Sequence, residues 1–435
     1  MPLATQRIVF DRRHVLRGGL ALGLAGALPG IAGAQPAGMQ DLLPYPASLS
    51  LIMNYLDRKS FPGGVVSIGR GAEEPDYVTA GTLAFDSAAE TDENTLWRIY
   101  SMTKPVTGMA AMILIDEGKL KLDQPVADFI PAFAKVRVLV DPAKGLESQP
   151  AKNVMTIRHL LTHSSGLGYH FSVPDALKAE YLRLGLIPAQ ISRQDFGDDL
   201  ILAPPVPLAP SLEAFADRLA TVPLAAEPGT KWIYSVSLDL LGRIIELASG
   251  MALDGFLAKR MFEPLNMTST FFRVPQARKA ELATNYAMIG TELKPVDQGA
   301  DSIYLDEPAF PFGGAGLVST ARDYDRFLAM LVGRGALGKT QIMSPQAATL
   351  GMSNLLPEGV SLDQEMGAGW GFGAGGRVGL NGVFKGFFGW AGAAGTVAWA
   401  DTVRKVRGGG YANFIAPENR KFQEAVPQAV YKDLK

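Results

Sequence analysis

Strand-like segments lie near both ends of this chain, with a long helical stretch between them. Residues 62–69 and 76–85 have the β-branched and alternating pattern of two short strands joined by a turn. From residue 366 onward the chain is again β-like, and it closes with an amphipathic helix around 417–432. Repeated β-α-β units are not the pattern. The order therefore predicts an α/β fold in which one antiparallel sheet, built from both ends and flanked by helices, carries an inserted helical lobe.

The predicted division follows from this order. We expect an α/β domain made of residues 41–120 and 280–435, and a mainly helical domain over residues 121–279. With 435 residues, 47% of them hydrophobic and 19% charged, the chain can bury a full core. A small-molecule site is expected in the cleft between the two parts.

The N-terminus has the composition of an export signal. The pair Arg12-Arg13 precedes a Gly-, Ala- and Leu-rich stretch over 18–28, and a small-residue cleavage site follows at 32–34. We interpret residues 1–34 as a twin-arginine signal peptide, which makes the export machinery a partner of the precursor. The mature protein would be periplasmic or secreted, and no membrane span is predicted in it.

Charge and residue usage exclude several classes of site. A net charge of −2 gives no basic patch for nucleic acid, and the absence of cysteine excludes disulfides, thiolate metal sites and cysteine nucleophiles. His159 and His163 have the spacing of a metal pair, but no glutamate follows His159 as a zinc protease requires. We therefore predict neither a metal nor a cofactor, and a small-molecule substrate.

A candidate nucleophile and base stand three residues apart at the start of a predicted helix. Ser101-Met102-Thr103-Lys104 would place a hydroxyl and an amine on the same side of that helix. A serine hydroxyl is a weak nucleophile until a neighbouring base takes its proton. By itself a Ser-x-x-Lys is expected about once by chance in a chain of this composition, so its setting has to support it.

A tyrosine offers a second candidate for proton transfer. Tyr234 follows a Pro228-Gly229 turn and leads into an apolar helix, which is a position from which a phenol can reach a cleft. In isolation, a tyrosine of this kind is more often a core residue with its hydroxyl at the surface.

Four motifs in register resemble one family. Ser101-x-x-Lys104, the segment Leu160–Leu167, Tyr234-Ser235-Val236 and the segment Gly313–Thr320 occur in the order found in class C β-lactamases, D-alanyl-D-alanine peptidases and family VIII carboxylesterases. The resemblance covers nearly all of the predicted mature chain. It implies a serine hydrolase in which Ser101 attacks a carbonyl, Lys104 and Tyr234 move its proton, and water releases the acyl group.

Departures from the β-lactamase motifs favour the esterase branch. Trp390 stands where the Lys-Thr-Gly motif has its lysine, and Val236 stands where Tyr-x-Asn has its amide. Both changes resemble family VIII carboxylesterases and imply an uncharged ester substrate, with Trp390, Gly392 and Val236 contacting it. By resemblance, the backbone N–H groups of Ser101 and Ala393 would form the oxyanion hole.

Alternatives to an esterase remain open. An amide hydrolase, such as a β-lactamase or D-Ala-D-Ala peptidase, would use the same nucleophile. A non-catalytic, penicillin-binding-like receptor is disfavoured because Ser101, Lys104 and Tyr234 are all present. An α/β-hydrolase is excluded because the chain lacks Gly-x-Ser-x-Gly and has no histidine after His170.

Overall fold

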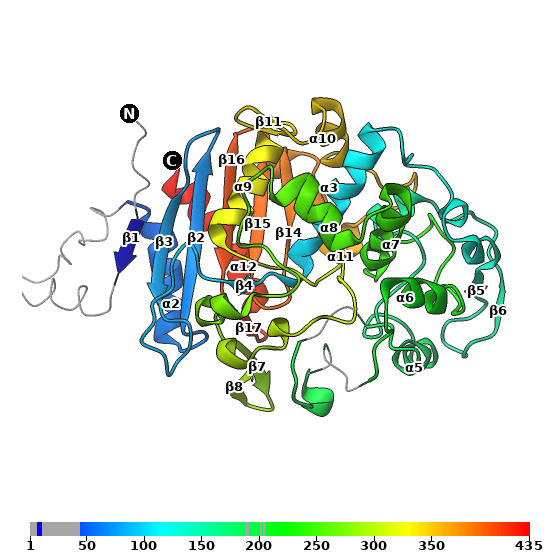
Figure 1. Cartoon of the computed structure of the whole chain (residues 1–435), viewed down its shortest axis with the longest axis horizontal. Coiled ribbons are helices and arrows are strands. Elements are labelled where there is room, and N and C mark those ends of the chain that lie inside the picture. The colour runs from blue at the N-terminus through cyan, green and yellow to red at the C-terminus, as the bar shows by residue number, and fades with distance from the viewer. Residues whose placement is uncertain (1–6, 11–43, 188–190, 201, 203–205) are drawn as a thin grey trace, which may run out of the picture.

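The computed structural model describes residues 7–10, 44–187, 191–200, 202 and 206–435 (Figure 1). The apolar stretch and cleavage site of the expected export signal lie outside these residues, so that signal stays a prediction. Among the residues that are described, no helix is long and apolar enough to cross a membrane.

One large sheet dominates the described part of the chain. Its eight strands run in the order β1-β3-β2-β16-β15-β14-β13-β12, and every neighbouring pair is antiparallel except β1 with β3. In chain order these strands are β1 (Arg7–Phe10), β2 (Gly63–Arg70), β3 (Asp76–Gly81), β12 (Trp370–Phe372), β13 (Arg377–Gly379), β14 (Phe387–Ala391), β15 (Val397–Asp401) and β16 (Val406–Tyr411). Strands β2 and β3, near the N-terminus, therefore share a sheet with the C-terminal strands. The link is the pairing of β2 with β16, which lies more than 300 residues later in sequence.

Smaller β-pairs and the helices complete the fold. The remaining strands are β4 (Trp97–Arg98), β5 (Arg137–Leu139), β6 (Ser148–Pro150), β7 (Asn285–Ile289), β8 (Glu292–Asp297), β9 (Val318–Ser319), β10 (Ala336–Leu337), β11 (Thr340–Gln341) and β17 (Phe414–Ile415). The helices are α2 (Pro46–Asp57), α3 (Thr103–Asp116), α4 (Ile157–Leu161), α5 (Asp175–Arg183), α6 (Leu212–Leu219), α7 (Ser237–Ser249), α8 (Leu253–Leu257), α9 (Ala321–Val332), α10 (Pro345–Gly351), α11 (Asp363–Met366) and α12 (Asn419–Asp433).

The two faces of the sheet are covered by different helices. On one face, α2 and α12 pack together over an apolar cluster that includes Phe61, Trp399 and Phe422. On the other face, α9 and α3 cover the central strands. Helices α5, α6 and α7 gather to one side of the sheet, in the region at the right of Figure 1.

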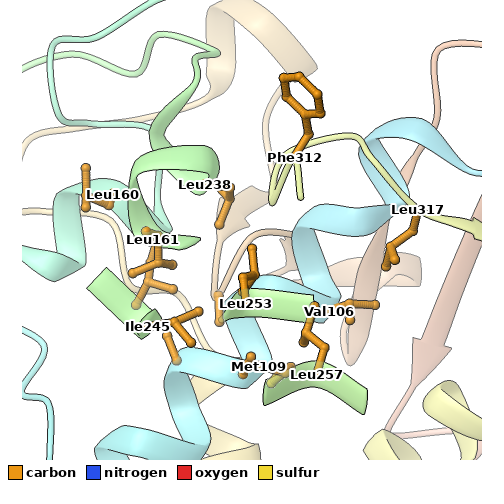
Figure 2. Close-up of a cluster of buried hydrophobic side chains, with 14 of the residues drawn as sticks. Val106, Met109, Leu160, Leu161, Leu238, Ile245, Leu253, Leu257, Phe312 and Leu317 are labelled. Carbon is orange, nitrogen blue, oxygen red and sulfur yellow. The ribbon is translucent and has the colours of Figure 1, made fainter. Parts of the chain in front are cut away.

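Helix α3 occupies the centre of the molecule. Every residue from Thr103 to Leu114 is buried. A helix that is apolar on all sides is stable only when other elements surround it. Figure 2 shows Val106 and Met109 of α3 beside leucines of α4, α7 and α8, including Leu161 and Leu257. This packing fixes the axis of α3 and therefore the position of Ser101, the candidate nucleophile, just before its start.

The predicted antiparallel sheet with flanking helices and a helical insertion is confirmed. Two details differ from the sequence prediction. Residues 7–10, inside the expected signal peptide, form the edge strand β1 along β3. The expected mainly helical domain, 121–279, also contains a short β-pair, β5 with β6. Nothing in the arrangement of elements tests the predicted domain limits at residues 120 and 280.

Candidate active site

A tight turn presents Ser101 at the entry to α3. Residues Tyr100–Met102 form one turn of 3-10 helix, and α3 continues directly from it. The residue before the serine, Tyr100, has φ of 39°, a conformation that is costly for a residue with a side chain. Strained backbone of this kind persists where the surroundings hold it, and it is common at catalytic residues.

Lys104 is positioned against Ser101 by burial and by one carbonyl group. Its Nζ lies 3.0 Å from Ser101 Oγ and donates a 2.7 Å hydrogen bond to the carbonyl of Gly314. The side chain is fully buried, with Nζ 4.6 Å from the centre of the Tyr234 ring. The amine therefore contacts the hydroxyl and the face of the phenol at once.

The Tyr234 hydroxyl is held by Trp390. The indole Nε1 of Trp390 donates a 2.9 Å hydrogen bond to the Tyr234 hydroxyl oxygen. Their ring centres are 5.6 Å apart, and Trp232 and Tyr169 pack on other sides of the same phenol. Trp390 thus contributes a directed hydrogen-bond donor as well as an aromatic surface.

The segment Leu160–Leu167 fixes the loop that carries Tyr234. The backbone N–H of Ile233 donates to the carbonyl of His163 at 2.8 Å, and His163 Nδ1 lies 2.9 Å from Ser235 Oγ. A further hydroxyl pair, Ser165 with Ser237, is 2.8 Å apart. Burial and the charge of Lys104 hold the pKa of His163 well below its usual value, so its imidazole is neutral.

The segment Gly313–Thr320 is joined along its length to the turn that carries Ser101. Strand β4, just before that turn, pairs with β9, and the N–H of Ile99 donates to the carbonyl of Leu317 at 3.1 Å. The Thr107 hydroxyl donates to the carbonyl of Gly313 at 2.7 Å. These bonds bring the Gly314 carbonyl to Lys104 from 210 residues away in sequence.

A buried aspartate lies on the other side of Gly314. The N–H of Gly314 donates to Asp239 Oδ1 at 2.9 Å, while the carbonyl of the same residue accepts from Lys104. Burial raises the pKa of Asp239 to about 7, and the Lys104 charge and the Gly314 N–H oppose that rise. A side chain at position 314 would collide with this carboxylate, since its Cβ would lie 2.5 Å from Oδ2.

Ser101 and Tyr234 line one mostly apolar cavity of about 450 Å³. Its aromatic walls come from Tyr100, Tyr169, Phe171, Trp232, Tyr234 and Trp390. Ala393 lines it near Ser101, and within the described residues neither backbone N–H has a hydrogen-bond partner. A Cβ at Gly392 would lie 2.4 Å from the carbonyl oxygen of Ile99, so only glycine permits this approach.

Comparison with known proteins identifies the family. The sequence profile of the Beta-lactamase family matches residues 50–424. The chain belongs to the β-lactamase family.

Relatives within the β-lactamase family include an esterase. Protein Rv1367c of Mycobacterium tuberculosis is 34% identical over 74% of this chain and 78% of its own length. Esterase EstB of Burkholderia gladioli is 30% identical over 73% of this chain and 76% of its own. The solved structure of EstCE1, a hydrolase with promiscuous acyltransferase activity, superposes with a TM-score of 0.73 at 26% identity, covering 91% of this chain and all of that one. The expected place among the family VIII esterases of the β-lactamase-like group is confirmed, and the protein is a serine hydrolase.

The structure brings together most of the residues that the β-lactamase motifs select. Ser101, Tyr234, Trp390, Gly392 and Ala393 all line the cavity, and Lys104 lies directly behind them. Val236 differs from the expectation, because its side chain is fully buried in the core at the start of α7 and does not line the cavity. His159 and His163, which have the spacing of a metal pair, instead make hydrogen bonds to the Thr156 backbone N–H and to the Ser235 hydroxyl. The described residues contain no cluster suited to a metal ion.

Two residues near the site escaped the sequence analysis. Asp239 is an acidic residue in an otherwise apolar helix start, five positions after Tyr234, and that contrast is a signal for a buried carboxylate. Arg377 lines the same cavity from β13. It falls in a glycine-rich stretch, and nothing in the sequence indicates that β13 lies beside the strand of Trp390.

Proposed function

We propose that this protein hydrolyses small carboxylic esters through an acyl-enzyme intermediate. The observation that carries the proposal is the 3.0 Å contact between Lys104 Nζ and Ser101 Oγ in a mainly apolar cavity. Relatives named as an esterase and as a hydrolase with acyltransferase activity support it.

The proposed reaction has two steps. In the first, Lys104 acts as the general base and accepts the proton of the Ser101 hydroxyl as Oγ attacks the ester carbonyl, and the departing alkoxide receives a proton through Lys104 and Tyr234. In the second, water attacks the acyl carbonyl and gives a proton to Lys104 and Tyr234, the bond between the acyl group and Ser101 Oγ breaks, and Oγ takes up that proton as the carboxylic acid leaves. The N–H groups of Ser101 and Ala393 would stabilise the oxyanion in both steps.

Trp390 supports the ester branch over the lactam branch. At the position where β-lactamases place a lysine, the indole is turned toward the Tyr234 hydroxyl and donates a hydrogen bond to it. This leaves no ammonium group there for the carboxylate of a lactam drug. An amide hydrolase remains the alternative function.

Acyl transfer is a second candidate. Acyltransferase calJ of Penicillium decumbens is 30% identical over 73% of this chain. An alcohol that replaces water in the second step would take the acyl group in the same site.

The decisive assay measures hydrolysis of p-nitrophenyl acetate through octanoate beside a chromogenic cephalosporin. Wild type is compared with Ser101→Ala, Lys104→Ala and Tyr234→Phe. We expect Ser101→Ala to abolish ester turnover and each of the other changes to lower kcat by orders of magnitude. Removing any one residue of a catalytic unit costs about as much activity as removing several of them.

The same assay separates the alternatives. Ester cleavage that depends on Ser101, with little lactam turnover, supports a carboxylesterase. Lactam turnover that exceeds ester cleavage would move the enzyme to the amide branch, and a larger yield of ester than of acid with added alcohol would indicate an acyltransferase. Full activity in Ser101→Ala would refute the mechanism.

A further inference from the structure

Arg377 lines the active-site cavity and has no ionic partner among the residues that the structure describes. The residue lies on β13, opposite Gly389 of β14 and one position from Trp390. It lines the same cavity as Ser101. Within the described part of the chain, its side chain forms no ion pair with a carboxylate, and its guanidinium donates no hydrogen bond to another residue.

The guanidinium is held in place by two aromatic rings. Its Cζ lies 4.6 Å from the centre of the Trp370 ring and 5.0 Å from that of Phe387. These contacts offset part of the desolvation of the guanidinium without using its N–H groups as hydrogen-bond donors to other side chains. The Nε is shielded from solvent and has no hydrogen-bond partner.

The nearby charges do not supply the missing partner. Glu424 of α12, which also lines the cavity, is paired with Arg420 at 2.9 Å. Glu365 of α11 lines the cavity as an exposed residue and makes no ion pair with Arg377. A buried cation of this kind is costly unless something pairs with it, and burial accordingly lowers the pKa of Arg377 to about 10, where it still carries its charge at neutral pH.

We propose that Arg377 binds a carboxylate on the substrate, so that the preferred esters carry a negative charge on their acyl or alcohol part. This inference rests on the proposed esterase function and narrows its substrate class. It replaces the uncharged ester expected from the loss of the motif lysine, because the structure brings a different cation to the cavity from the neighbouring strand. A carboxylate matches the paired N–H donors of a guanidinium edge.

The test compares esters that differ only in charge. The first pair is the p-nitrophenyl monoester of adipic acid and its terminal amide, and the second is 4-acetoxybenzoate and 4-acetoxybenzamide. We measure kcat/KM for wild type, Arg377→Gln and Arg377→Lys. In at least one pair, wild type should prefer the acid about tenfold or more, the glutamine variant should abolish that preference, and the lysine variant should retain part of it.

A matched control separates charge recognition from general damage. Arg404 also stacks on a ring, with Cζ 5.7 Å from the centre of Tyr431, but it does not line the cavity. Arg404→Gln should leave the acid-to-amide ratio at its wild-type value. Inhibition of the wild-type enzyme by adipate and by adipamide needs no variant, and adipate should be the stronger competitive inhibitor.

The outcomes distinguish this inference from the esterase proposal. Equal turnover of acid and amide in both pairs by wild type, or a preference that Arg377→Gln leaves unchanged, overturns the carboxylate site and leaves the esterase intact. Failure of every ester to react in a manner dependent on Ser101 overturns the esterase proposal itself.

Discussion

Replacing Asp239 with asparagine should stabilise the protein at neutral pH. The Asp239 side chain is fully buried, and its Oδ2 has no hydrogen-bond partner within the described residues. Burial raises its pKa from 3.8 to about 7, and a rise of that size corresponds to about 4 kcal/mol. Asparagine has nearly the same shape as aspartate, and its side-chain oxygen can still accept the hydrogen bond from the Gly314 N–H. It carries no charge, so its burial has no desolvation cost of that kind.

The sign of the effect follows from proton binding. Between pH 4 and pH 7 the unfolded chain has lost the Asp239 proton, whereas the folded chain keeps it. The wild type therefore loses stability as the pH rises through this window, by up to about 4 kcal/mol, and Asp239→Asn avoids that loss. The difference in unfolding free energy between variant and wild type should grow from pH 4 to pH 7 and then level off.

Urea denaturation at pH 4, 5.5 and 7 measures this difference, and a second buried aspartate provides the control. Asp325 Oδ1 pairs with Arg407 Nε at 2.8 Å. Asp325→Asn would leave the buried Arg407 without its counter-charge and should destabilise the protein at pH 7 by about 3–5 kcal/mol. A difference between Asp239→Asn and wild type that stays constant across pH would refute the assigned burial cost.

Two further changes test the site geometry. Trp390→Phe removes the donor to the Tyr234 hydroxyl and should lower kcat/KM about 10- to 100-fold. The control, Trp232→Phe, alters the same aromatic cluster but loses no hydrogen bond. Similar losses in both variants would contradict the role of Trp390 as a hydrogen-bond donor to Tyr234. Gly392→Ala would place a Cβ 2.4 Å from a carbonyl of the nucleophile turn and should reduce kcat about 100-fold with an unchanged circular dichroism spectrum. Gly255→Ala, where no atom lies within 4 Å of the new Cβ, is the control, and full kcat in Gly392→Ala would count against the predicted oxyanion hole.

The linear sequence determined the fold class of this protein and its assignment as a serine hydrolase, because both depend on local patterns. Alternation and turn residues near 62–85 and after 366 predict strands at both chain ends. The spacing from Ser101 to Lys104 is one helical turn, so the contact between them follows once a helix begins there. Tyr234 needed the resemblance to a family, because no local rule distinguishes it from a core tyrosine.

Tertiary structure decided which distant groups surround these residues. Asp239 meets Gly314 only because α7 packs beside the loop that precedes β9, and Arg377 reaches the cavity only because β13 pairs with β14. Val236 was expected from its motif position to contact the substrate, but its side chain is buried in the core. The burial of a side chain depends on segments that are hundreds of residues apart in the sequence. Burial in turn sets the pKa of a carboxylate such as Asp239 and decides whether a cation such as Arg377 has a partner, so no short stretch of sequence contains that information.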